Sequence, residues 1–398
     1  MKRILVFCFS LFTFTILAFP VSQKVTKIAE KSLQFSAQQY SLMAEVMKDK
    51  PNLLPRTIDD SGKLITSKAN WWTSGFFPGT LWYLAEYTKN EKIRTDAELM
   101  SQRVANQQYV TNNHDVGFMI YCSYGNGYRL YPTDEYKNII INTARSLSTR
   151  FNPKVGLIRS WDHGKWQYPV IIDNMMNLEL LFNATKFSGD SSFYNIAVAH
   201  ANKTMINHFR SDASSYHLVS YNPMTGIPEL KGTVQGYSDS SSWARGQAWA
   251  LYGYTMCYRE TNDIIFLKHA LRIADFLLSN PRMPNDLIPY WDFDAPNIPN
   301  ALRDASAGAI MCSAFIELSG YVKGKESKRF LKAAEKQILT LSSPQYQAKL
   351  GENGNFILKH SVGSFPHNAE MDVPLTYADY YYVEALMRYI HLNEKVKK

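Results

Sequence analysis

Residues 246–279, GQAWALYGYTMCYRETNDIIFLKHALRIADFLLS, contain two helical patterns of different kinds, one directly after the other. In the first, 246–260, small and apolar side chains cover most faces, as is typical of a helix buried on all sides. In the second, 264–279, apolar side chains recur on one face and charged side chains occupy the other. The apolar face consists of Leu267, Leu271, Ala274 and Leu278. This stretch predicts an inner helix followed by an outer helix.

The same alternation extends along most of the chain. Amphipathic patterns, which predict outer helices, cover residues 28–46, 93–109, 136–150, 193–209, 264–279 and 326–342. Patterns that are apolar or rich in small residues on most faces predict inner helices at 76–88, 115–130, 173–187, 246–260, 304–320 and 376–391. Six outer and six inner helices in alternation predict an all-α fold, the (α/α)6 barrel, whose inner helices line a central cavity.

The N-terminal residues 1–22 predict a signal peptide, because Lys2 and Arg3 precede an almost wholly apolar run. That run is shorter than the ~20 residues of a membrane-spanning helix, and no later stretch approaches this length. We therefore expect a secreted or periplasmic protein without a membrane-embedded body, with a retained N-terminal anchor as the alternative. No linker or low-complexity segment divides residues 23–398, which predicts a single catalytic domain.

The composition narrows the classes of partner. The net charge of +8 is concentrated in 323–336 and 395–398, which indicates a solvated helix face and a polar tail. No basic stripe for nucleic acid is present, whereas a mild positive field suits an anionic substrate. Eight tryptophans offer platforms for sugar rings. The spacing of the cysteines predicts buried small hydrophobes, and neither a disulfide framework nor a zinc site; they are Cys8, Cys122, Cys257 and Cys312.

The longest connections precede inner helices, at 151–172, 210–244, 280–303 and 343–375. Because long ordered loops at one rim usually carry function, we expect the site where inner helices begin. Six distant segments bring polar and aromatic groups to this rim. They contain Trp71-Trp72, His114-Asp115, Asp173-Asn174, Trp243 to Trp249, Arg303-Asp304 and Tyr377 to Tyr380.

Two of the aspartates, Asp115 and Asp173, predict carbohydrate chemistry. Two carboxyls in an apolar cavity should have pKa values pushed apart, leaving one protonated and one ionised, as glycosidic chemistry requires. The alternative is helix capping, since Asp115, Asp173 and Asp304 all occupy expected N-cap positions. It is the stronger explanation for Asp304.

Other rim residues also have two interpretations. Arg245 could bind a substrate carboxylate or form a structural ion pair. His217 could bind substrate or only support its loop. Trp72, Trp82 and Trp249 could stack on sugars or belong to the core, and the core is favoured for Trp82. His114-Asp115 is reminiscent of metal-dependent phosphohydrolases, but His163, His200 and His208 do not follow in register, so no metal is expected.

At these same residues the sequence resembles the unsaturated glucuronyl hydrolases, glycoside hydrolase family 88. The matching stretches span nearly all of residues 23–398 in order: 72–79 (WTSGFFPG), 114–118 (HDVGF), 123–126 (SYGN), 172–178 (IDNMMNL), 232–239 (GTVQGYSD), 243–249 (WARGQAW) and 372–380 (DVPLTYADY). The resemblance implies the (α/α)6 barrel, no cofactor, and short oligosaccharides made by polysaccharide lyases as substrates.

The resemblance also implies roles for individual residues. Asp173 would protonate C4 of the unsaturated uronic acid and help activate the water that adds at C5, while Asp115 would hold substrate hydroxyls as its ionised neighbour. The residues implied in binding the sugar and its carboxylate are Gln235, His217, Trp243, Arg245 and Trp249, with Trp161 as a stacking tryptophan. Family members that accept sulfated units carry Ser-x-x-Ser-x-Lys. Here Ser361 and Ser364 match, Pro366 replaces the lysine, and Lys359 is a possible substitute.

Three other functions fit the same fold. A rhamnogalacturonyl hydrolase would use the same chemistry on pectin fragments. A non-catalytic barrel would keep the aromatic cavity without turnover, and a sugar isomerase would use mainly His114 and His217. The intact aspartate pair favours a hydrolase acting on glycosaminoglycan fragments.

Overall fold

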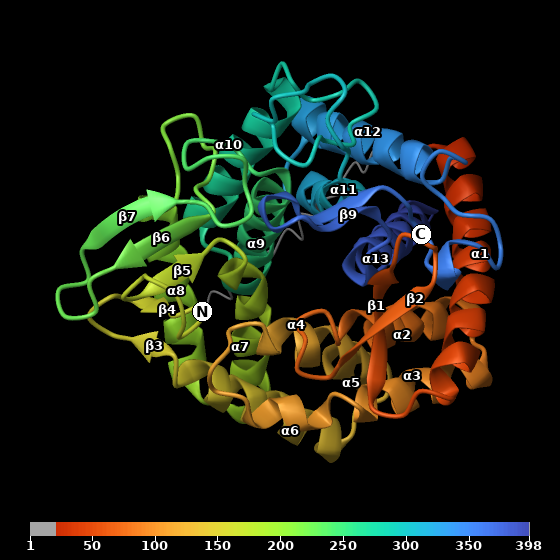
Figure 1. The fold of residues 1–398 in the computed structure, drawn as a ribbon, viewed down its shortest axis with the longest axis horizontal. Coiled ribbons are helices and arrows are strands. Elements are labelled where there is room, and N and C mark those ends of the chain that lie inside the picture. Colours follow the sequence, from red (N-terminus) through yellow and green to blue (C-terminus); the bar gives the residue numbers. More distant parts are fainter. Residues whose placement is uncertain (1–20, 398) are drawn as a thin grey trace, which may run out of the picture.

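The computed structural model describes residues 21–397 and shows a ring of helices around an inner ring (Figure 1). The predicted signal peptide lies almost entirely outside the described residues. The outer helices are α1 (Gln23–Lys48), α3 (Glu91–Gln102), α6 (Asp134–Ser148), α8 (Ser191–Asn207), α10 (Ile264–Ser279) and α12 (Gly324–Leu341). The inner helices are α2 (Phe76–Thr88), α4 (Val116–Ile120) continued by α5 (Asn126–Leu130), α7 (Asn174–Ser188), α9 (Ala244–Thr261), α11 (Ala305–Ser319) and α13 (Thr376–Lys397). The predicted (α/α)6 barrel is confirmed.

Local signals in the sequence set the ends of these helices. Asn262 adopts a left-handed conformation and ends α9, and the side chain of Asp263 then accepts a hydrogen bond from the backbone of Ile265 to cap α10. In the same way, Gly189 adopts a left-handed conformation and ends α7, and the side chain of Asp190 caps α8. These inner-to-outer connections are therefore tight, and the loops at the other end of the barrel are free to be long.

The inner helix at 115–130 differs from the expected continuous helix. A π-helical turn, η2 (Tyr121–Gly125), separates α4 from α5. A Cβ at Gly125 would lie 2.9 Å from the Tyr121 ring, so glycine allows the widened turn to close. The outer segment expected at 93–109 likewise divides into α3 and a short 3-10 turn, η1 (Ala105–Tyr109).

The loops at the rim contain short strands that the helical patterns did not predict. All of them lie in segments that lead into inner helices, where antiparallel pairing satisfies the backbone of long connections. The pairs are β1 (Leu53–Ile58) with β2 (Leu64–Lys68), β3 (Phe151–Asn152) with β4 (Leu157–Ile158), and β8 (Ser361–Ser364) with β9 (Ala369–Val373). A separate three-stranded sheet has the order β5 (Pro169–Ile171), β6 (Leu218–Tyr221), β7 (Pro228–Gly232).

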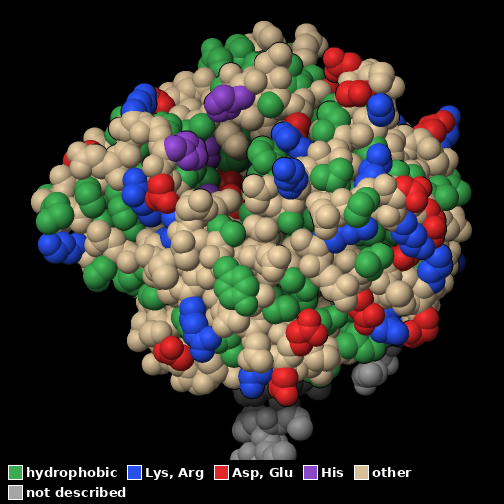
Figure 2. Space-filling view, turned by 60° about the horizontal axis from the view of Figure 1, so that its bottom comes forward, with side chains coloured by type: hydrophobic (Ala, Val, Ile, Leu, Met, Phe, Trp, Pro, Cys, Tyr) green, Lys and Arg blue, Asp and Glu red, His purple; other side chains and the backbone are tan. Residues whose placement is uncertain are grey.

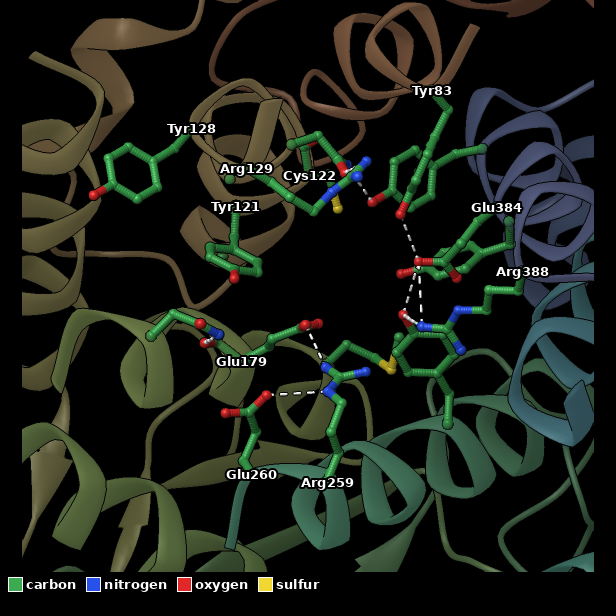
Figure 3. Close-up of a pocket in the computed structure, with 18 of the residues that line it drawn as sticks. Tyr83, Tyr121, Cys122, Tyr128, Arg129, Glu179, Arg259, Glu260, Glu384 and Arg388 are labelled. Carbon is green, nitrogen blue, oxygen red and sulfur yellow. Dashed lines mark hydrogen bonds and ion pairs between the residues drawn. The ribbon is translucent and has the colours of Figure 1, made fainter. Parts of the chain in front are cut away.

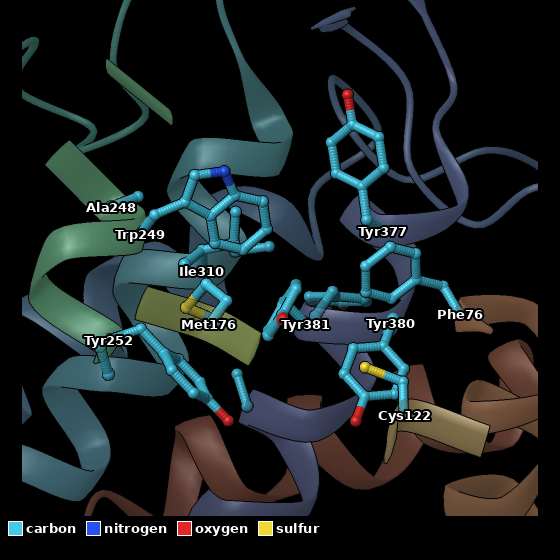
Figure 4. Close-up of a cluster of buried hydrophobic side chains, with 14 of the residues drawn as sticks. Phe76, Cys122, Met176, Ala248, Trp249, Tyr252, Ile310, Tyr377, Tyr380 and Tyr381 are labelled. Carbon is cyan, nitrogen blue, oxygen red and sulfur yellow. The ribbon is translucent and has the colours of Figure 1, made fainter. Parts of the chain in front are cut away.

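A layer of buried aromatic side chains fills the middle of the barrel (Figure 4). Tyr381 from α13 packs against Trp249 from α9 and Phe76 from α2, with ring centroids 5.3 and 5.9 Å apart. All three rings are buried. Cys122, Cys257 and Cys312 are also buried and free, as predicted, whereas Cys8 lies outside the described residues. The layer separates the loop-bearing rim from the opposite end of the barrel.

Candidate active site

Asp173 stands at the first position before α7, yet its side chain does not cap that helix. Its Oδ2 is buried and has no hydrogen-bond partner in the described part of the chain. The chain just before Asp173 is held by another segment of the rim, because the backbone N–H of Ile172 donates to the carbonyl of His217 at 2.9 Å. Capping therefore does not explain this aspartate, and an unsatisfied buried carboxylate oxygen indicates a functional role.

Asp115 has the same relation to α4, again without a capping hydrogen bond. Its Oδ1 lies 3.1 Å from Nε2 of His114. The other ring nitrogen of His114, Nδ1, lies 2.9 Å from the carbonyl oxygen of Ser160 and donates to it. Burial lowers the pKa of His114 to about 4, so the ring is neutral and Nε2 carries the lone pair. A protonated Asp115 carboxyl suits this neighbour.

The pKa values of the two carboxyls differ from the expectation of one acid and one ionised group. Burial raises the pKa of Asp115 to about 7 and that of Asp173 to about 6. For Asp173, the nearby Arg245 and His114 lower the pKa and the charge of Asp115 raises it, each less than burial does. Because desolvation acts on both groups alike, the free site raises both pKa values together. Both values fall where a carboxyl can accept and donate a proton near neutral pH.

Asp304 is a helix cap, as the alternative to a catalytic role predicted. Its Oδ1 accepts hydrogen bonds from the backbone N–H and the hydroxyl of Ser306 and so caps α11. Its Oδ2 lies 3.5 Å from Arg245. Asp304 is thus a buried structural residue of the rim.

His217, directly before β6, faces Asp173. Its Nδ1 accepts from the backbone N–H groups of Val234 and Gln235 at 3.0 and 3.2 Å. Since Nδ1 accepts, the proton of the neutral ring resides on Nε2, which points at Oδ2 of Asp173 across 3.7 Å. Burial lowers the pKa of His217 to about 3, so this ring does not become a cation near neutral pH.

Arg245 is buried at the start of α9 and binds groups of the protein. Its guanidinium donates to the carbonyls of Val362 and Gly363 on β8 and to Oε1 of Gln235. The guanidinium carbon lies 4.4 Å from the ring centroid of Trp243, which in turn contacts His217 at 4.6 Å. The ion pair of Arg245 with Asp304 fits the structural interpretation, while its Nε is buried without a partner among the described residues, so binding of a substrate carboxylate stays a prediction. Through all these contacts the structure brings Gln235, His217, Trp243, Arg245 and Asp173 together.

The tryptophans divide into core and rim. Trp82 is fully buried and its indole N–H donates to Ser101, which confirms the core interpretation. Trp249 is also fully buried, against Phe118 and Tyr381, but its indole N–H has no partner in the described chain. Trp72 is half-buried against Phe118 and Tyr377.

Trp161 lies in the loop between β4 and β5. It follows Ser160, whose carbonyl holds His114, and its ring stacks on His163 with centroids 5.7 Å apart. Its indole N–H has no partner within the described residues. The hydrogen bond between Ser160 and His114 therefore joins the residue before Trp161 to the residue before Asp115.

The two predicted serines lie on the β8–β9 hairpin beside Arg245. Ser361 is buried with an unpartnered hydroxyl, and the hydroxyl of Ser364 lies 2.7 Å from Nδ1 of His367. Lys359 points elsewhere, because its Nζ donates to the carbonyl of Pro344. The suggestion that Lys359 replaces the absent family lysine is therefore not supported by its contacts.

These contacts define a site in which buried polar atoms converge without partners. They belong to Asp173, His217, Trp249, Ser361 and Tyr377, and all come from the rim. Figure 2 shows a hollow on the face in view, with acidic side chains at its floor and histidine, lysine and arginine at its edge. No group of three or more His, Cys, Asp or Glu in residues 21–397 could hold a metal ion. The arrangement suits proton transfer to a polar substrate.

Comparison with known proteins assigns the family. An unsaturated glucuronyl hydrolase of Formosa agariphila is 48% identical over 320 residues, covering 80% of this chain and 79% of the relative. The chain belongs to the unsaturated glucuronyl hydrolases. No protein-family model matches the chain. As an unsaturated glucuronyl hydrolase it is a glycoside hydrolase.

Solved structures of unsaturated glucuronyl hydrolases share the fold. A crystal structure of one specific for heparin is 46% identical, with a TM-score of 0.90 over 92% of this chain and 98% of that one. An asparagine variant of the Streptococcus agalactiae enzyme, complexed with dGlcA-GalNAc6S, is 26% identical with a TM-score of 0.79, covering 94% of this chain and 93% of that chain.

The sequence analysis of this unsaturated glucuronyl hydrolase missed two supporting residues. His114 was named at the rim, but only as a rejected metal ligand or an isomerase residue, and its support of Asp115 was not predicted. Asp292 was not considered. Its buried carboxylate accepts from the backbone N–H of Tyr237 and the hydroxyl of Ser241, and so orders the loop that presents Gln235. Asp292 lies in a loop without any pattern, so only the fold reveals its role.

Proposed function

We propose that this enzyme removes the C4–C5 unsaturated uronic acid from the non-reducing end of glycosaminoglycan fragments made by lyases. The observation that carries the proposal is the buried, unpartnered Oδ2 of Asp173 opposite Nε2 of His217, on a carboxyl with a pKa raised to about 6. The relatives bearing this name, and the saccharide held by the S. agalactiae enzyme, support an anionic sugar as the ligand.

The reaction begins with hydration of the double bond. Protonated Asp173 gives its proton to C4, and water adds its oxygen to C5 while its proton returns to the Asp173 carboxylate. The product is a hemiketal at C5, which opens to a ketone and leaves a hemiacetal at C1. That hemiacetal expels the attached sugar as an alcohol. Asp115 and Gln235 would hold hydroxyls and the uronate, and Trp161, Trp243 and Trp249 would provide apolar surface.

Loss of ultraviolet absorbance tests the proposal, because hydration removes the conjugated double bond. Purified enzyme would be incubated with unsaturated disaccharides from heparin, chondroitin and hyaluronan, and with an unsaturated pectic disaccharide as the control. We expect the glycosaminoglycan substrates to lose absorbance, the heparin disaccharide fastest because the heparin-specific structure is so similar. Loss with the pectic substrate alone, or with none, would refute the proposal.

We also propose that residues 1–22 direct export to the periplasm or the medium, and that residues 23–398 form one catalytic domain. The basic start and apolar run support export. No helix among residues 21–397 is long and apolar enough to cross a membrane. Expression with residues 1–22 should place the shortened protein in the periplasmic fraction or medium. Full-length protein in the cytosolic fraction would count against export.

A further inference from the structure

A second cavity of about 600 Å³ occupies the end of the barrel away from the rim loops (Figure 3). Its lining on α7 runs from Met176 through Glu179 to Phe187 near the end of that helix. None of the rim residues Asp115, Asp173, His217 and Arg245 lines it, and Tyr381 of the aromatic layer forms part of its wall. The cavity is thus separate from the site at the rim.

The π-helical turn η2 faces this cavity. Tyr121, Cys122 and Gly125 all belong to the turn and to the cavity wall. Such turns insert one residue into a helix and occur frequently at functional sites. In Figure 3 the rings of Tyr121 and Tyr128 stand on one side of the space, and Glu179 and Arg259 stand on another.

Arg129, Arg259 and Arg388 line the cavity, and each pairs with carboxylates of the protein. Arg129 donates to the two carboxylate oxygens of Glu86 at 2.9 and 2.7 Å. Arg259 pairs with Glu179, Glu260 and Glu317. Arg388 pairs with Glu317 and Glu384 and donates to the hydroxyl of Tyr252 at 2.8 Å. The lining glutamates Glu179, Glu260 and Glu384 are also ion-paired, so an anionic ligand would have to displace an existing pair to reach a guanidinium.

The groups that remain available suit a cation. Only Oε1 of Glu179 has a partner among the described residues, and its Oε2 is open. The hydroxyl of Tyr121 also has no partner there and points toward Glu179 in Figure 3. Burial raises the pKa of Glu179 to about 7; the charge of Arg259 lowers this pKa, and the charges of Glu260, Glu384 and Glu317 raise it. A bound cation would relieve this crowding of carboxylates. Tyrosine rings favour ammonium groups through their faces.

We propose that this cavity is a second ligand site that binds a hydroxylated organic ammonium compound, of the chemical class of the amino sugars. The ammonium group lies beside Glu179, and a hydroxyl of the ligand bonds to that of Tyr121. The proposal rests on the cavity alone and does not depend on which glycosaminoglycan the enzyme hydrolyses.

Calorimetric titration at pH 7.5 with glucosamine tests it, with N-acetylglucosamine as the uncharged control. We expect a dissociation constant of about 1 mM or tighter for glucosamine and at least tenfold weaker binding of N-acetylglucosamine. Glu179→Gln should weaken glucosamine binding at least tenfold. Asp173→Asn, altered at the rim, should bind glucosamine like the unaltered enzyme.

Because Glu179 pairs with Arg259, Glu179→Gln could lose binding simply by disturbing the fold. A second variant separates the two effects. Tyr121→Phe removes only an unpartnered hydroxyl and should weaken glucosamine binding about threefold to tenfold while leaving hydrolysis intact. Equal binding of both sugars, no binding of glucosamine, or binding that is lost in Asp173→Asn and kept in Tyr121→Phe would each overturn the proposal.

Discussion

Nε2 of His217 points at Oδ2 of Asp173 across 3.7 Å, and neither atom has another partner among the described residues. The backbone N–H groups of Val234 and Gln235 fix the tautomer of the histidine, so a donor faces the carboxyl. At this distance the two groups do not bond directly. Both are therefore available to a substrate or a water molecule placed between them.

Asp173→Asn should abolish turnover while binding of the unsaturated disaccharide persists. The amide keeps the shape of the carboxyl but cannot donate a proton to C4 and recover it from water. Ultraviolet loss measures turnover, and calorimetry measures binding. Asp190→Asn is the matched control, because that exposed aspartate caps α8 at the other end of the barrel. Substantial activity in Asp173→Asn would assign this aspartate a structural role only.

His217→Gln should reduce kcat/KM by about tenfold to a hundredfold without moving the pH profile between pH 5 and 8. The reason is that burial lowers the pKa of His217 to about 3, so it stays neutral throughout that range. Exposed His391 at the opposite end provides the control variant His391→Gln. A pH limb that disappears with His217 would show that the histidine itself titrates during catalysis.

The sequence predicted the barrel because each helix carries its own burial pattern, as the neighbours α9 and α10 illustrate. It also singled out Asp115 and Asp173, since helix starts are recognisable locally, and their catalytic roles stay predictions. The contacts of Arg245 could not be predicted in this way. Its partners Val362 and Gly363 lie more than a hundred residues away, on a hairpin without a helical pattern. Such pairings depend on the assembled rim.

Asp173→Asn should also stabilise the protein above pH 7. The folded pKa of about 6 exceeds the ordinary 3.8, so the folded state binds more protons between these values and stability falls as pH rises through them. Removing the ionisable group should restore on the order of 3 kcal/mol at pH 8 and almost nothing at pH 4. Urea unfolding at both pH values measures the difference.

Asp190→Asn provides the contrast for this measurement. Hydrogen bonds from Ser192 lower the pKa of Asp190, so this aspartate adds stability at pH 8 that is lost at acid pH. Its asparagine variant should not gain stability at pH 8. If both variants gained the same stability at pH 8, the cause would be the change in net charge and not the burial of Asp173.

His367→Ala should lower kcat/KM for a sulfated disaccharide about tenfold and leave the unsulfated one nearly unchanged. The hydroxyl of Ser364 lies 2.7 Å from Nδ1 of His367, so the hairpin presents a hydroxyl and an imidazole side by side where the family lysine is absent. Both can donate to sulfate oxygens. Lys359→Ala is the control and should change neither rate, because Lys359 bonds to Pro344. An unchanged ratio of the two rates in His367→Ala would remove this histidine from sulfate recognition.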